Sequence, residues 1–253
     1  MKIAFYGDSL TRGIPGISSF GMLETQLPEH ELTNHGRNGD TVASLYRRIA
    51  TNRFQDGIDI AVLWVGVNDV LAKVTLTHSL VKRLMKQPWA TDLIEFRHDY
   101  DRTIQLLRQH AGTVLTVSPL LIGEDLRNPW NKDLAERCKI IASISACIEH
   151  VHWLDIRADF AERLKAKTIS DYTPRSVMSI ARDVLFLRTP AQIDAAAASR
   201  GLHLTLDGVH LNSEGAKLVT EAFQKTFRAF SASFEPSTRG RHSTDTPPIG
   251  HID

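Results

Sequence analysis

Short apolar segments alternate with segments of helical periodicity along most of this chain, and this alternation limits the possible folds more than any other feature. The clearest apolar segment is Ile58–Val65, which is almost wholly hydrophobic and is typical of a buried strand. Such alternation indicates right-handed βαβ crossovers, which place helices on both faces of a parallel sheet. We therefore predict an α/β fold, a three-layer α/β/α sandwich with a five-stranded parallel sheet.

The pattern also gives approximate positions for the elements. The predicted strands are Lys2–Tyr6, Glu31–His35, Ile58–Val65, Thr113–Ser118 and Val151–Asp155. The two longest predicted helices are roughly Asp92–His110 and Lys132–Glu149. In a sheet of this kind ligands bind at the carboxyl ends of the strands, so the residues that follow each strand are the first candidates for a site.

Two regions depart from the alternation. Residues 158–205 have no strand pattern but contain apolar helical stripes, so we predict a helical insertion there. Residues 235–253 are rich in proline and poor in aliphatic side chains, which predicts a disordered tail. We expect residues 1–234 to form a single domain.

Composition and charge exclude several classes of protein. The chain has 30 Lys and Arg against 29 Asp and Glu, a net charge of +1 that argues against a nucleic acid as partner. Its two cysteines, Cys138 and Cys147, lie in one predicted helix and cannot bridge within it, so we expect no disulfide framework. No apolar run is long enough to cross a membrane, and no signal peptide is evident after Met1. These features predict a cytoplasmic protein without stable membrane insertion, and they leave its oligomeric state open.

Four short motifs contain residue types suited to chemistry, and three of them follow predicted strands. They are Gly7-Asp8-Ser9-Leu10, Asn38-Gly39-Asp40-Thr41, Gly66-Val67-Asn68-Asp69 and Asp207-Gly208-Val209-His210. Each motif alone is typical of a turn. Together they can meet in one crevice and bring a hydroxyl, an imidazole, a carboxylate and neutral hydrogen-bond donors, which are the groups that acyl transfer requires.

In this order the four motifs resemble the sequence blocks of the SGNH or GDSL hydrolase superfamily, over roughly residues 1–230. The resemblance implies that Ser9 is the nucleophile, His210 the general base and Asp207 the carboxylate that orients the imidazole. It also implies an oxyanion hole made by Gly39, Asn68 and the backbone N–H of Ser9, and a flavodoxin-like arrangement of the predicted sandwich. An Asp three residues before a His on a turn can reach Nδ1, which leaves Nε2 free for the serine.

The resulting hypothesis is a serine esterase or related acylhydrolase that cleaves carboxylic esters through an acyl-enzyme intermediate, with a small ester or acyl substrate. No metal or other cofactor is expected. Two alternatives remain open, a metal-dependent phosphoesterase with Asp8, Asn68, Asp207 and His210 as ligands, and a catalytically silent ligand-binding domain.

Other residues near the motifs receive simpler interpretations. For Asp8 and Asp69 we expect structural roles as caps of loop N–H groups. His203 is a weaker candidate for the wall of the site. The insertion at 158–205 has two interpretations of equal weight, an apolar cap over the site or a helical pair packed on the edge of the sheet.

Overall fold

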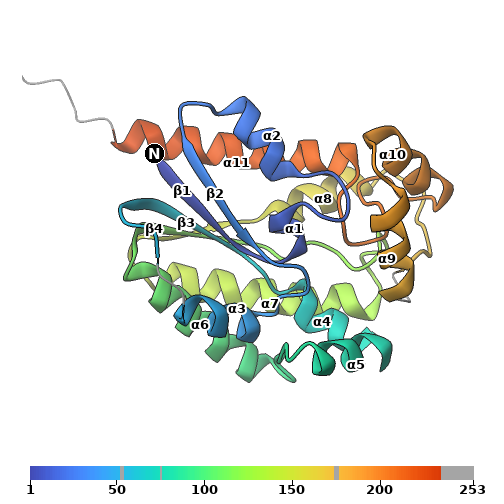
Figure 1. Ribbon diagram of the computed structural model, residues 1–253, viewed down its shortest axis with the longest axis horizontal. Helices are drawn as coiled ribbons and strands as arrows, with labels where there is room; N and C mark the ends of the chain where they lie inside the picture. The colour runs from blue at the N-terminus through green and yellow to red at the C-terminus, as the bar shows by residue number, and fades with distance from the viewer. Residues whose placement is uncertain (52–53, 75, 174–176, 235–253) are drawn as a thin grey trace, which may run out of the picture.

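The centre of the fold is a five-stranded parallel sheet with the strand order β2-β1-β3-β4-β5 (Figure 1). The computed structural model describes residues 1–51, 54–74, 76–173 and 177–234. The strands are β1 (Lys2–Gly7), β2 (Glu31–Gly36), β3 (Ile58–Trp64), β4 (Ala111–Val117) and β5 (Val151–Leu154). All five predicted strands are therefore present, with ends that differ from the prediction by at most two residues.

Helices cover both faces of the sheet, so the predicted three-layer sandwich is confirmed (Figure 1). One face buries Phe5, Val62 and Leu115 beneath three helices, α2 (Ser19–Gln26), α8 (Ile156–Leu164) and α11 (Ser213–Phe234). The other face buries Tyr6 and Leu63 beneath α3 (Val42–Ala50), α6 (Leu93–Arg108) and α7 (Pro129–Ala146). The side chains alternate between these two cores along β1, from Ile3 to Tyr6, and along β3, from Ile60 to Trp64, as the period of two requires.

A further set of helices gathers around the carboxyl ends of the strands, at the right in Figure 1. They are α1 (Ser9–Arg12), α4 (Val67–Val74), α5 (Leu76–Leu84), α9 (Val177–Phe186) and α10 (Pro190–Ser199). The motifs after β1 and β3, each typical of a turn when taken alone, therefore lead directly into helices. The Asp8 carboxylate accepts a hydrogen bond from the backbone N–H of Leu10 and caps α1, which explains why one short helical turn forms there.

Helix capping also explains where the two longest predicted helices begin. The Asp92 side chain accepts hydrogen bonds from the backbone N–H groups of Ile94 and Glu95, so α6 starts within one residue of the prediction. The Asn128 side chain caps α7 and Pro129 occupies its first turn, so this helix starts three residues before the predicted Lys132. The helix ends at Ala146, which leaves Cys147 exposed at its C-cap.

The region after β5 divides into two parts. Helix α8 belongs to the sandwich, because Ile156, Phe160 and Leu164 are buried in the core beneath α11. Within the predicted insertion, the helices that depart from the alternation are thus α9 and α10. The predicted tail at 235–253 lies outside the described residues. Within the described part of the chain, no helix combines the length and hydrophobicity needed to cross a membrane.

Candidate active site

The four motifs meet at the carboxyl edge of the sheet. Ser9 follows β1 as the first residue of α1, Gly39 lies in the loop after β2, and Asn68 follows β3 in the first turn of α4. Asp207 and His210 lie in the loop that precedes α11. The strand order changes direction between β1 and β3, so Ser9 and Asn68 flank the topological switch point at which ligands bind in such sheets.

Ser9, His210 and Asp207 form a continuous chain of hydrogen bonds. His210 Nε2 lies 3.0 Å from Ser9 Oγ, and His210 Nδ1 lies 2.8 Å from Asp207 Oδ2. All three residues are buried, with at most 5% of their surface exposed. The structure therefore brings together three side chains that are separated by as many as 201 positions in the sequence.

A tight turn holds the Asp207 carboxylate against the imidazole. Asp207 Oδ1 accepts hydrogen bonds from the backbone N–H groups of Val209, at 3.0 Å, and His210, at 2.9 Å. Gly208 lies between Asp207 and Val209 with a φ of +88°, a conformation that glycine adopts without steric cost. One carboxylate oxygen thus fixes the turn while the other faces Nδ1, which positions Nε2 toward Ser9.

The two charged partners shift each other's pKa. Burial alone would lower the pKa of His210, but attraction to Asp207 and the hydrogen bond between them outweigh burial and raise it above the usual value. Burial would raise the pKa of Asp207, yet the same interactions hold it below its usual value. The carboxylate therefore stays ionised, and the imidazole is a stronger base than an isolated histidine.

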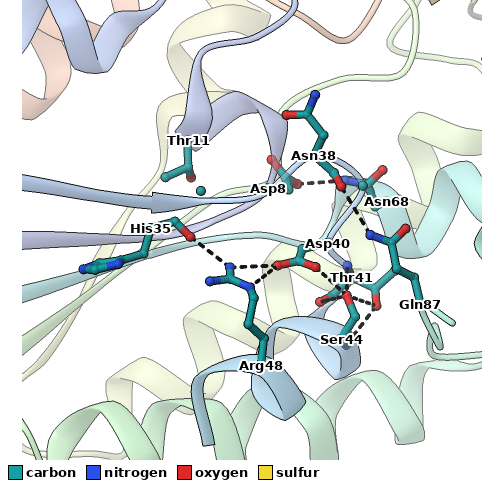
Figure 2. A network of polar contacts seen from close by, with 12 residues as sticks. Asp8, Thr11, His35, Asn38, Asp40, Thr41, Ser44, Arg48, Asn68 and Gln87 are labelled. Carbon is teal, nitrogen blue, oxygen red and sulfur yellow. Dashed lines mark hydrogen bonds and ion pairs between the residues drawn. The ribbon is translucent and has the colours of Figure 1, made fainter. Parts of the chain in front are cut away.

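Potential oxyanion donors lie beside Ser9. Gly39 and Asn68 line the same cavity as Ser9 and His210, and Gly39 has a φ of +78° that brings its main chain close to the cavity. Asn68 Nδ2 donates one hydrogen bond to Asp8 Oδ2, at 3.2 Å (Figure 2). A primary amide carries two hydrogens on this nitrogen, so the second can serve a ligand.

Asp8 and Asp69 have the structural roles predicted for them. Asp8 accepts from the backbone N–H of Leu10 and from Asn68. Asp69 accepts from the backbone N–H groups of Val42 and Ala90, at 3.1 Å each, and so ties α4 to the first residue of α3 and to the segment before α6. Burial raises the pKa of Asp8 to about 7, although the bond from Leu10 and attraction to His210 oppose this.

The cavity next to Ser9 is small and mostly apolar. It has a volume of about 180 Å³, below the roughly 300–1,000 Å³ that is usual for pockets that hold larger ligands. Its apolar lining consists of Pro15, Leu71, Val81, Met85 and Ile180. Helix α5 and the residue after it supply Val81 and Met85, whereas α9 contributes Ile180. The insertion thus forms one part of the wall, and α5 forms more of it.

Sequence reasoning missed α5 as part of the site. Its polar residues His78 and Lys82 are buried against the cavity, while Leu76, Leu80 and Leu84 are exposed, with 88%, 58% and 74% of their surfaces accessible. This burial pattern is the reverse of an ordinary amphipathic helix, so hydrophobic periodicity gives no indication of its inner face. His203 proves not to line the cavity, and its Nε2 lies 3.0 Å from the carbonyl oxygen of Thr168.

A metal site has no support from the arrangement of side chains. Among the residues that the structure describes, no group of three or more His, Cys, Asp or Glu side chains is placed to hold a metal ion. Asp8 and Asp207 are both engaged by backbone N–H groups. The described residues therefore do not provide the group of metal ligands that the phosphoesterase alternative requires.

Solved structures with the same architecture include esterases. The acetyl xylan esterase AlAXEase has a TM-score of 0.62 and 23% identity, over 89% of this chain and 99% of that chain. The acetylxylan esterase Axe2 from Geobacillus stearothermophilus has a TM-score of 0.61 and 20% identity, over 88% and 92%. LAE5, an α/β hydrolase enzyme from the metagenome of Lake Arreo in Spain, has a TM-score of 0.61 and 18% identity, over 88% and 93%. At these identities the likeness shows a shared fold.

The comparison with protein families is more specific. No curated protein matches the chain. The model of the GDSL-like lipase/acylhydrolase family matches residues 5–218, which span all four motifs from Ser9 to His210. The chain therefore belongs to the GDSL-like lipase/acylhydrolase family and is a hydrolase of ester bonds.

Proposed function

We propose that this hydrolase is a serine esterase in which Ser9 forms an acyl-enzyme. His210 takes the proton of the Ser9 hydroxyl as Oγ attacks the ester carbonyl, and then donates it to the departing alcohol. Water repeats the attack with His210 again as base, and Ser9 is released with the carboxylic acid product. The observation that carries this proposal is the 3.0 Å contact between His210 Nε2 and Ser9 Oγ inside a cavity.

The negative charge of the tetrahedral intermediate needs hydrogen-bond donors that are in place before the reaction. In this proposal the backbone N–H groups of Ser9 and Gly39 and the Nδ2 of Asn68 are those donors. Asp207 stabilises the imidazolium that forms on His210 and fixes its tautomer, with no proton transfer to the carboxylate. The ionised state of Asp207 supports this role, because its pKa is held low by His210 even though burial opposes it.

We further propose that the acyl group of the substrate is short. A cavity of about 180 Å³ with apolar walls suits an acetyl group or a chain a few carbons longer, and leaves little room for a fatty acyl chain. Two of the structural neighbours are described as acetyl xylan esterases, which makes acetyl esters the first substrates to test.

The test is steady-state hydrolysis of p-nitrophenyl acetate and longer p-nitrophenyl esters by the wild type and by Ser9→Ala. We expect hydrolysis with a preference for short acyl groups, and a loss of about 1,000-fold or more in kcat for Ser9→Ala. Ser199→Ala, which changes an exposed serine on α10, is the matched control and should keep full activity. Unchanged turnover in Ser9→Ala would contradict the proposal, and a folded wild type with no turnover of any ester would favour a ligand-binding domain.

A further inference from the structure

The C-terminal end of α5 contacts the loop that contains Gly39. Lys82 Nζ donates a hydrogen bond to the carbonyl oxygen of Gly39, at 2.8 Å. Gln87 Nε2 donates to the carbonyl oxygen of Asn38, at 3.2 Å (Figure 2). Both side chains are buried, with 5% and 4% of their surfaces exposed. The backbone N–H of Gln87 donates to the carbonyl of Lys82, so the two side-chain donors are linked at the end of one helix.

These two bonds restrain the peptide groups on either side of Gly39. The carbonyl of Asn38 and the N–H of Gly39 belong to one planar trans peptide and point in opposite directions. When Gln87 holds that carbonyl, it therefore fixes the direction of the Gly39 N–H. The next peptide is held at both ends, because Lys82 binds the Gly39 carbonyl and the Asp40 N–H donates to the carbonyl of Arg37, at 3.1 Å.

The loop needs such restraint because glycine has few intrinsic preferences. A peptide next to Gly39, with its φ of +78°, can rotate at small steric cost and turn its N–H away from the cavity. On the far side the Asp40 carboxylate binds Arg48, with Nε at 2.9 Å, and the Ser44 hydroxyl, also at 2.9 Å (Figure 2). That network anchors Asp40 but does not touch the peptide that precedes Gly39.

We infer that Lys82 and Gln87 are positioning residues that hold the Gly39 N–H in the direction required for an oxyanion hole. The inference rests on the proposed function, since it assigns a purpose to the Gly39 donor. It also explains why Lys82 on α5 and Gln87 just after the helix are buried against the cavity while the leucines of α5 face solvent. Because neither side chain touches the reacting atoms, their loss slows the chemical step and leaves substrate binding nearly unchanged.

The charge of Lys82 gives this role a characteristic pH dependence. Burial lowers the pKa of Lys82 to about 8, and the carboxylates of Asp69, Asp8 and Asp40 limit the fall. His78, on the same helix, also faces Lys82, and its pKa is lowered by burial and by that ammonium. As the ammonium loses its proton above about pH 8, its bond to the Gly39 carbonyl weakens, so wild-type kcat should fall there.

The first experiment compares the kinetics of Gln87→Met and Lys82→Met with wild type, on p-nitrophenyl acetate. We expect kcat to fall about 10- to 100-fold in each variant, less than the loss of a whole oxyanion donor, with KM within about threefold. The advantage of wild type over Lys82→Met should also shrink above about pH 8, whereas Lys82→Arg should recover part of the lost kcat. Arg83→Met is the matched control, since it removes a neighbouring exposed cation from the same helix.

A second measurement separates positioning from a general structural effect. An alkylboronic acid forms a tetrahedral adduct with an active-site serine, so its affinity should fall by the same factor as kcat in each variant. Full kcat in Gln87→Met, or a change confined to KM, would overturn the inference. If Lys82→Met does not fold, the kinetics of Gln87→Met alone test whether the two side chains position the Gly39 N–H. A fluorophosphonate that still labels Ser9 in such a variant would leave the proposed function intact, whereas no labelling in wild type would overturn both.

Discussion

At the scale of single residues, two aspartate side chains differ in pKa and in role because their hydrogen-bond partners differ. Asp207 faces an imidazole and is held ionised, whereas Asp8 faces an amide and a backbone N–H at the end of a buried strand. Burial raises the pKa of Asp8 to about 7, while His210 keeps the pKa of Asp207 low. The difference arises from the partner and not from the depth of burial, since both side chains are almost fully buried.

Replacing Asp207 with Asn should change both rate and pH dependence. The variant removes the attraction to Asp207, so the lowering of the His210 pKa by burial would then be opposed only by attraction to Asp8 and Asp183. We expect kcat to fall by about 1,000- to 10,000-fold and the acid limb of the kcat/KM profile to move to lower pH. Asp171→Asn, on an exposed carboxyl, is the control. An acid limb that stays in place would contradict the assigned pairing of Asp207 and His210.

Asp8 predicts a pH dependence of stability. Its pKa is raised in the folded state, so between about pH 4 and pH 7 the folded protein binds more protons than the unfolded chain. The contribution of Asp8 to the free energy of unfolding therefore decreases as pH rises through that window. Urea unfolding at pH 5 and pH 8 should show a larger loss of stability for wild type than for Asp8→Asn. Equal losses in the two proteins would show that Asp8 ionises normally.

At the scale of helices and strands, α5 determines much of the shape of the cavity. Its inner face supplies Val81, His78 and Lys82 to the cavity wall, and Met85 follows at its end. Its outer face exposes Leu76, Leu80 and Leu84. Neighbouring positions on this one helix therefore differ in whether they face the cavity, which allows a matched comparison.

Shortening Val81 should widen the range of acyl groups accepted. We expect Val81→Ala to raise the kcat/KM of the butyrate ester relative to the acetate ester by about fivefold or more, because small changes in pocket volume alter discrimination by this order. Leu80→Ala, next to it but 58% exposed, should leave the ratio unchanged. Parallel measurements on Ile180→Ala compare the contribution of α9. An unchanged ratio in Val81→Ala would show that α5 does not contact the acyl group.

Whether a helix or strand could be predicted from the sequence depends on whether its hydrophobic side chains are the buried ones. The strands were predictable because segments such as Ile58–Trp64 are buried on both faces and are apolar except at Asp59. The meeting of the four motifs was predictable because three of them follow parallel strands, which end at one edge of the sheet. Helix α5 was not predictable as part of the site, since its buried face carries His78 and Lys82. Lys82 is buried because it contacts the Gly39 loop, a tertiary contact that local periodicity does not indicate.

At the scale of the whole molecule, buried Glu124 joins two distant segments. Its carboxylate accepts hydrogen bonds from the backbone N–H groups of His203, Leu204 and Thr205 and from the Thr205 hydroxyl, at 2.8 to 2.9 Å. The bonds fix the segment that leads into Asp207 from a position about 80 residues earlier. No local pattern around Glu124 indicates this contact, so it could not be predicted from the sequence.

Removal of the Glu124 carboxylate should therefore destabilise the fold. Glu124→Ala leaves three backbone N–H groups without their acceptor in a buried site, which should cost about 3 kcal/mol or more of the free energy of unfolding. Glu136→Ala, which removes an exposed carboxylate paired with Lys139, should cost about 1 kcal/mol or less. Urea denaturation of both variants provides the comparison, and similar midpoints would contradict the role given to Glu124.

In the proposed mechanism, the buried Ser9 reacts because His210, which is 201 positions away in the sequence, lies against it. The most direct measurement is to treat the folded protein with a fluorophosphonate and locate the adduct by mass spectrometry, in wild type, Ser9→Ala and His210→Ala. We expect one adduct on Ser9 in wild type, none in Ser9→Ala, and greatly slowed labelling in His210→Ala. Labelling of another residue, or labelling of Ser9 at the same rate without His210, would contradict it.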